Sequence, residues 1–185
     1  MTKSSKFRTL ASRWLKWSVG VLGVGGVALG ATFYFAPQTR WPLVLWLIRA
    51  QFPHAKQVET KTLAKWLRDP SEKILLLDIR KPEEYQVSHL PNAIHVLPKS
   101  DVSEAIQHIK QHKPTKIVLY CSIGYRSAKY VERLHEAGIQ QVYNLEGSIF
   151  RWANEGRVLK KGDKDVHKVH PYNPRWGEML SKSYR

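Results

Sequence analysis

Short apolar runs alternate along the chain with segments whose apolar residues recur at helical spacing. Ile74–Asp78 reads ILLLD and residues 117–120 read IVLY, which are continuous apolar runs typical of strands covered on both faces. Shorter strands are predicted at 57–59, 93–96 and 142–145, and helices at 60–68, 82–88, 103–110, 127–137 and 147–154. This alternation predicts an α/β fold, in which helices flank a parallel sheet and ligands bind at the carboxyl ends of the strands.

Two of the predicted helices have clear boundary signals. Thr60 is expected to cap the helix at 60–68, with Leu63, Ala64 and Leu67 facing inward. The helix at 127–137 is expected to end at Gly138, a residue that commonly terminates helices.

A longer apolar stretch precedes the alternating region. Residues 1–16 are basic and contain no acid, and residues 17–36 then run for twenty positions without a charge, which is long enough for a helix to cross a bilayer. Aromatic residues flank this stretch on both sides, as they do in spanning helices. One transmembrane helix is therefore predicted at 17–36, with a cleaved signal peptide as the alternative.

The basic residues around the predicted span indicate its orientation. Five of them precede it, which favours a cytoplasmic N-terminus and a domain on the far, extracytoplasmic side. The apolar juxtamembrane segment at 37–55 contains 41–48 (WPLVLWLI), which is too short to cross and is expected to lie in the membrane interface or against the domain.

Charge narrows the range of partners. The formal net charge is +15, with 30 Lys and Arg against 15 Asp and Glu. The cations are spread along the chain without a nucleic-acid-reading motif, so anionic lipid is the expected partner and nucleic acid is not. The tail at 160–185 is basic, and its Trp176, Met179 and Leu180 are expected to dock back onto the domain.

The only cysteine lies between a predicted strand and a predicted helix. Cys121 opens the loop CSIGYR, in which backbone N–H groups and the positive end of the helix dipole point into the hollow. These N–H groups and Arg126 would stabilise a thiolate, and Gly124 suits a backbone that curls with φ > 0. Cys121 is therefore predicted to be a nucleophile, although a lone cysteine at a strand end can also be a small buried hydrophobe.

Three blocks together resemble the single-domain rhodaneses, a family of sulfurtransferases, over residues 57–159 of a domain expected at 56–159. They are LLLDIRKPEEYQVSHLPNAIHV at 75–96, CSIGYR at 121–126 and NLEGSIFRW at 144–152. The first has Asp78, Arg80, Glu84, His89, Pro91 and Ala93 in the family's usual places. The third usually has two adjacent glycines, and here the second is Ser148, which we expect to be a small departure.

The resemblance implies a chemistry and a set of site residues. Cys121 would take sulfane sulfur from a small anionic donor such as thiosulfate, and its persulfide would pass that sulfur to a thiol or cyanide-like acceptor. The N–H groups of Ser122, Ile123, Gly124, Tyr125 and Arg126 would cradle the anion, and Arg126 would help to hold the donor. Asp78 and Arg80 would either border the pocket or form a structural salt bridge.

No cofactor or metal is expected. His108 and His112 are four residues apart but lack a third ligand, and a metal site at His167 and His170 is disfavoured. His89 is expected to brace a turn.

Two other functions remain open. Phosphatases and arsenate reductases of the same fold use Cys-x5-Arg, whereas this loop is Cys-x4-Arg, and a shorter loop favours sulfur over phosphate. The second alternative is a binding or sulfur-sensing module. The sequence does not determine the oligomeric state.

Overall fold

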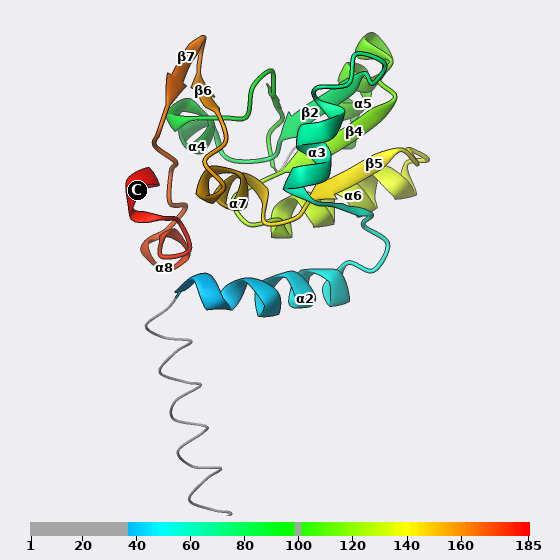
Figure 1. Cartoon of the computed structure of the whole chain (residues 1–185). Helices are drawn as coiled ribbons and strands as arrows, with labels where there is room; N and C mark the ends of the chain where they lie inside the picture. Colours follow the sequence, from blue (N-terminus) through cyan, green and yellow to red (C-terminus); the bar gives the residue numbers. More distant parts are fainter. Residues whose placement is uncertain (1–36, 99–100) are drawn as a thin grey trace, which may run out of the picture. The chain divides into compact units, whose positions relative to one another are not determined.

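A five-stranded parallel sheet is the centre of the molecule (Figure 1). The computed structural model describes residues 37–98 and 101–185, and Trp41–Arg185 forms one compact unit. The strands are β1 (Gln57–Val58), β2 (Ile74–Asp78), β3 (Ile94–His95), β4 (Lys116–Tyr120) and β5 (Val142–Leu145), in the order β1-β5-β4-β2-β3. The central strands β2 and β4 pair in register from Ile74 opposite Lys116 to Asp78 opposite Tyr120. Both are almost entirely buried, as their uninterrupted apolar sequence predicts.

Helices cover both faces of the sheet, so the predicted α/β architecture is confirmed. They are α3 (Thr60–Trp66), α4 (Pro82–Val87), α5 (Val102–His112), α6 (Tyr125–Glu136) and α7 (Ser148–Asn154). The helices α5 and α6 pack together on one face, and α3 and α7 pack together on the other (Figure 1). This arrangement follows from right-handed crossovers between parallel strands.

The start of α3 differs from the sequence prediction. Glu59 occupies the cap position and Thr60 is the first helical residue, so the predicted Thr60 cap is wrong. The Thr60 hydroxyl instead donates to the carboxylate of Glu155, at 2.7 Å from Oε1. Leu67, predicted to face inward, is 40% exposed, and Trp66 packs edge-on against Tyr143 in its place.

Residues after the sheet fold back onto the domain. A hairpin of β6 (Leu159–Lys161) and β7 (Lys164–Val166) is followed by the short α8 (Pro174–Gly177) and the 3₁₀ helix η2 (Lys182–Tyr184). Met179 and Leu180 are fully buried in the main core and Trp176 packs against that core, which confirms the predicted docking. The basic C-terminal residues therefore belong to the folded domain.

A helix before the sheet also joins the core. After the short 3₁₀ helix η1 (Pro37–Arg40), α2 (Trp41–Gln51) buries Val44 and Ile48, and Phe52 beyond it stacks edge-on against Tyr125 at 5.0 Å. The Arg49 Nε of α2 donates to Glu146 at 2.7 Å. The inner face of this helix thus lies against the domain, which was one of the two placements expected for 41–48.

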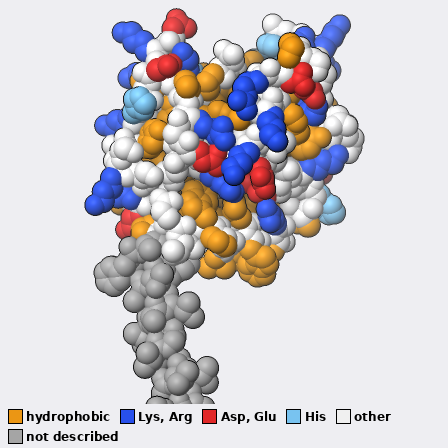
Figure 2. Space-filling view, viewed as in Figure 1, with side chains coloured by type: hydrophobic (Ala, Val, Ile, Leu, Met, Phe, Trp, Pro, Cys, Tyr) orange, Lys and Arg blue, Asp and Glu red, His pale blue; other side chains and the backbone are white. Residues whose placement is uncertain are grey.

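The outer face of α2 is apolar and exposed. Leu43, Trp46 and Leu47 are 44%, 62% and 51% exposed, and hydrophobic side chains gather along the lower edge of the molecule over this helix (Figures 1 and 2). No helix within residues 37–98 and 101–185 is long and apolar enough to cross a membrane. The basic segment at 1–16 and the span predicted at 17–36 lie outside these residues.

The packing of α2 predicts a position-dependent loss of stability. Ile48→Ala should lower the free energy of unfolding by about 2 kcal/mol, because it removes a buried aliphatic side chain from the core. Leu43→Ala on the exposed face of the same helix should change it by less than about 0.5 kcal/mol. Equal effects in denaturant titrations of the full chain would show that α2 does not pack as described.

Candidate active site

Cys121 lies where β4 ends and α6 begins. Its side chain is 1% exposed, and its sulfur accepts a hydrogen bond from the Gly124 N–H at 3.2 Å. Gly124 has φ +109, a conformation that glycine adopts readily, and this turns the loop around the sulfur. The helix α6 therefore starts at Tyr125, two residues earlier than predicted, so Arg126 lies in its first turn.

The surroundings of Cys121 favour the thiolate. Burial raises the pKa of the Cys121 thiol, but the charge of Arg126, Ser127 and the Gly124 N–H together lower that pKa below its ordinary value. The Ser127 hydroxyl is buried and has no other hydrogen-bond partner among the described residues, so it is free to donate to a charged sulfur. The first N–H groups of α6, which have no partner within the helix, add to the same positive potential.

Ser148 fixes the backbone at the cysteine. Its Oγ accepts from the Cys121 N–H at 3.0 Å and donates to the Leu145 carbonyl at 3.1 Å. Ser148 also adopts φ +50, the conformation that suits the second glycine of the usual pair. The departure at this position is therefore more than a tolerated change, because the hydroxyl pairs a buried N–H that glycine would leave without a side-chain partner.

A buried carboxylate connects α4 to the loop. Glu84, whose side chain is 1% exposed, accepts from Arg126 Nη1 at 2.7 Å and Nη2 at 2.8 Å and from the Ser122 hydroxyl at 2.8 Å. Burial raises the pKa of Glu84, but the Arg126 guanidinium, the Lys81 N–H and the Ser122 hydroxyl together hold that pKa below its ordinary value. The ring of Tyr172 covers the guanidinium at 4.8 Å. Arg126, predicted to hold the donor, is thus already paired with a carboxylate.

Asp78 and Arg80 do not line the cavity, so the structure shows the structural salt bridge expected for them and not the pocket border. Both are completely buried, and their side chains form a two-pronged ion pair with Nε–Oδ1 of 2.9 Å and Nη2–Oδ2 of 2.6 Å. Arg80 Nη2 also donates to the Ser88 carbonyl at 2.5 Å, which ties β2 to the end of α4. His89 follows Ser88, and its ring stacks on the ring of Tyr85 with the two ring centres 4.3 Å apart, which braces the turn.

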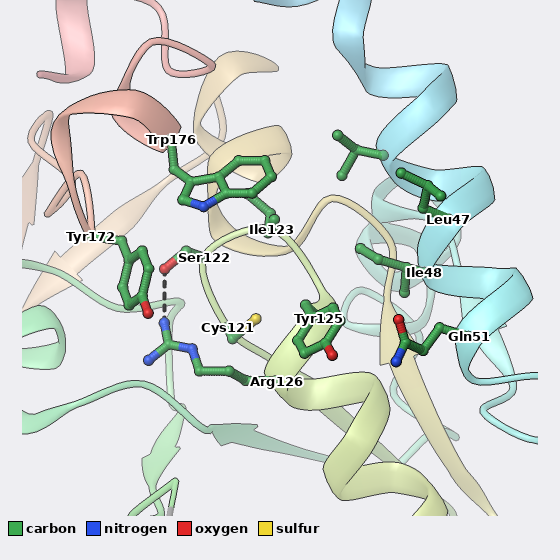
Figure 3. A pocket seen from close by; sticks show the side chains of 11 residues that line it. Leu47, Ile48, Gln51, Cys121, Ser122, Ile123, Tyr125, Arg126, Tyr172 and Trp176 are labelled. Atoms are coloured by element: carbon green, nitrogen blue, oxygen red, sulfur yellow. Dashed lines mark hydrogen bonds between the residues drawn. The ribbon is translucent and has the colours of Figure 1, made fainter.

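The reactive loop forms the floor of a cavity of about 410 Å³ (Figure 3). The loop contributes Cys121, Ser122, Ile123, Tyr125 and Arg126, all of which were predicted for the site. The cavity also has two walls that the sequence did not predict as parts of the site: α2 on one side, and Tyr172 with Trp176 on the other. Their only sequence signals were the short apolar run at 41–48 and the expected docking of Trp176.

The described residues contain no cluster of three or more potential metal ligands. His112 Nδ1 is within 2.9 Å of the His108 carbonyl, so that ring nitrogen is engaged by the helix itself.

The hydrogen bonds and backbone of Ser148 predict that replacing it by alanine destabilises the protein more than replacing it by glycine. Ser148→Ala should lower the free energy of unfolding by about 2 kcal/mol, because it keeps the left-handed backbone and leaves the Cys121 N–H unpaired. Ser148→Gly should cost about 1 kcal/mol less than alanine, because glycine adopts φ +50 without strain. Thermal or denaturant unfolding measures both, and an alanine variant as stable as the glycine variant would contradict this account.

The ion pair of Glu84 predicts a pH-dependent contribution. Glu84→Gln should lower the free energy of unfolding by about 2 kcal/mol at neutral pH, because it leaves Arg126 without its counter-charge. The pKa of Glu84 is lowered on folding, so this contribution is fully present above the ordinary value of 4.5 and is lost as the pH falls through the lowered pKa.

The difference between wild type and Glu84→Gln should therefore narrow in acid, measured by denaturant titrations at several pH values. Glu83→Gln is the matched control, because Glu83 is 58% exposed and should contribute less than about 0.5 kcal/mol at any pH. A difference that stays constant from neutral to acid pH would show that the Glu84 charge is not what stabilises the loop.

Comparisons with known proteins agree with this architecture. The tRNA uridine(34) hydroxylase of Escherichia fergusonii is 29% identical over 119 residues, which are 63% of this chain and 33% of that protein. The hydroxylase of Cronobacter sakazakii is 30% identical over 118 residues, 62% of this chain and 33% of its own length. The chain thus spans about a third of the curated relatives that it matches.

Solved structures show the same fold. The thiosulfate sulfurtransferase from Pseudomonas aeruginosa superposes with a TM-score of 0.54 at 22% identity, over 68% of this chain and 24% of that chain. The rhodanese-like domain of an Anabaena protein gives 0.51 at 21% identity, over 63% and 89% of the two chains. The sequence profile of the rhodanese-like domain matches residues 60–155, more than half of the chain. With three signature blocks, a five-stranded parallel sheet and a cysteine at the carboxyl end of its central strand, this chain belongs to the rhodanese-like family.

Proposed function

We propose that the protein is a sulfurtransferase in which Cys121 carries sulfur as a persulfide. The observation that carries the proposal is a thiol of lowered pKa on the floor of a cavity, with the Gly124 N–H at 3.2 Å from its sulfur. A thiolate is the form of cysteine that attacks sulfur, and a neighbouring N–H group favours the charged form before and after the transfer.

The first step loads the cysteine. The Cys121 thiolate attacks the outer sulfur of thiosulfate and forms a new S–S bond, while the S–S bond of thiosulfate breaks and sulfite leaves with the electron pair. The negative charge then lies on the outer sulfur of the persulfide, within reach of the N–H groups at the start of α6. The step needs no oxidant, because one S–S bond forms as another breaks.

The second step transfers the sulfur to an acceptor and regenerates the free Cys121 thiolate. The thiolate of an acceptor attacks the outer sulfur of the persulfide, and Cys121 leaves as the thiolate that its surroundings stabilise. Cyanide would take the same sulfur and leave as thiocyanate. Because Cys121 is the only cysteine, no second thiol of this chain resolves the persulfide.

The loop favours this chemistry over the alternatives. Its Cys-x4-Arg spacing is shorter than the Cys-x5-Arg of phosphatases, and its Arg126 is paired with Glu84. A module that only binds a partner would not need a thiol with a lowered pKa, whereas a sulfur sensor would react through the same thiolate and is distinguished by the absence of turnover. The hydroxylase name belongs to relatives of which this chain covers about a third, so we propose for it only the thiolate chemistry of its own loop.

We also propose that the domain is tethered to a membrane by residues 17–36, with the N-terminus cytoplasmic and the domain on the far side. The uncharged stretch and the basic residues before it support this, as does the exposed apolar face of α2. Anionic lipid would then be a partner of the basic surface.

Intact-mass spectrometry of the full chain tests the proposed transfer. Incubation with thiosulfate or another sulfane-sulfur donor should add one sulfur atom, and cyanide or a reductant should remove it. Cys121→Ser should gain none, because it removes the only thiol in the chain. A folded wild-type chain that gains no sulfur from any donor would exclude the persulfide mechanism.

A further inference from the structure

The cavity above Cys121 is lined mainly by hydrocarbon. Val44, Leu47 and Ile48 of α2 form one wall, and Trp176 stands opposite them with Cys121 between (Figure 3). Ile123 extends this apolar lining down to the reactive loop. A volume of about 410 Å³ is far larger than a small inorganic anion needs and is suited to a small organic molecule.

The cavity offers little side-chain charge to an anion. Arg126 is the only cationic residue among those that line it, and both of its terminal nitrogens donate to the Glu84 carboxylate. The ring of Tyr172 covers the guanidinium from the side. A divalent anion that enters this cavity would therefore lose its hydration water. Only the N–H groups at the floor would then offset its charge.

The walls come from outside the shared domain. The rhodanese-like match covers residues 60–155, whereas α2 lies before it and Trp176 lies after it. Both segments are nevertheless fixed in the core, because α2 buries Ile48 and the C-terminal segment buries Met179. The family supplies the reactive loop, and the flanking segments supply the surroundings of whatever reaches it.

We propose that the sulfur donor carries an apolar organic group, which this cavity binds while its sulfane sulfur meets Cys121. The inference rests on the proposed sulfur transfer and assigns its substrate class: organic thiosulfonates and related organic sulfane compounds are preferred to small inorganic ones. Each buried methylene strengthens binding about fourfold, so a phenyl group gives a measurable preference.

The transfer from a thiosulfonate is balanced in the same way as that from thiosulfate. The Cys121 thiolate attacks the terminal sulfur, a new S–S bond forms, and the bond between the two donor sulfurs breaks. The organic sulfinate leaves with the electron pair. Its apolar group lies between α2 and Trp176 throughout, so the walls act on binding and orientation rather than on the bonds that change.

Two donors that differ only in their organic group test the proposal. Methanethiosulfonate and benzenethiosulfonate are each incubated with the full chain, prepared without free detergent that would compete for the cavity. Persulfide formation on Cys121 is followed by intact mass, and each rate is divided by the rate of the same donor with a free thiol in solution. The benzene compound should be faster by about tenfold after this correction.

Two tryptophan variants show whether the cavity causes the preference. Trp176→Ala removes part of a wall and should bring the ratio of the two corrected rates close to one. Trp46→Ala removes a tryptophan that is 62% exposed and does not line the cavity, so it should leave the ratio unchanged. Leu47→Gln, at a half-exposed position of the α2 wall, should lower the ratio even if Trp176→Ala unfolds.

The outcomes separate this proposal from the one on which it rests. If neither these two donors nor thiosulfate forms the persulfide, the sulfurtransferase function itself is excluded. Persulfide from thiosulfate but from neither thiosulfonate would overturn the apolar substrate class alone. Persulfide from both with a corrected ratio below about threefold would overturn the apolar substrate class alone. A large ratio that neither wall variant lowers would also overturn it, because the preference would then arise elsewhere.

Discussion

The buried carboxylate of Glu84 is the contact on which the reactive loop depends. It accepts three hydrogen bonds from Ser122 and Arg126, and it reaches them from α4, on a different segment of the chain. A largely buried carboxylate and guanidinium stabilise the fold only if they are well hydrogen-bonded, and here two N–H···O bonds of 2.7 and 2.8 Å join them. The pair fixes the position of Arg126, whose charge acts with Ser127 and the Gly124 N–H to lower the pKa of Cys121 against the effect of burial.

Cys121 has to be both buried and ionisable, which are opposing requirements. Burial alone would keep the thiol protonated, so the structure compensates with Arg126, with the Gly124 N–H and with the start of a helix. Ser148 holds the cysteine backbone while these groups act on its sulfur. The left-handed backbone at Ser148 is the local strain that this geometry requires, whereas Gly124 adopts its positive φ without strain.

The segments on either side of the shared domain have a structural role and, in our proposal, a functional one. α2 and the C-terminal residues bury apolar side chains in the main core, and they also form the walls over the reactive loop. The outer face of α2 remains apolar and exposed next to that cavity, with Leu47 belonging to both surfaces. A donor with an apolar group would find a continuous apolar path from the surface to the cysteine.

The sequence by itself determined the sheet, the order of its elements and the reactive loop. Ile74–Asp78 and Val142–Leu145 were predicted to the residue. In Ile74–Asp78 the signal is four consecutive apolar residues, as expected of a strand covered on both faces. Only the tertiary structure decided that Arg126 pairs with Glu84, 42 residues away, that Thr60 bonds Glu155, and that Asp78 and Arg80 pair away from the cavity. The local pattern of apolar and polar residues indicates whether a residue is buried and which secondary-structure element it favours. The partner of a buried charge, and the walls that α2 and Trp176 place over Cys121, depend on contacts between distant segments that local pattern does not encode.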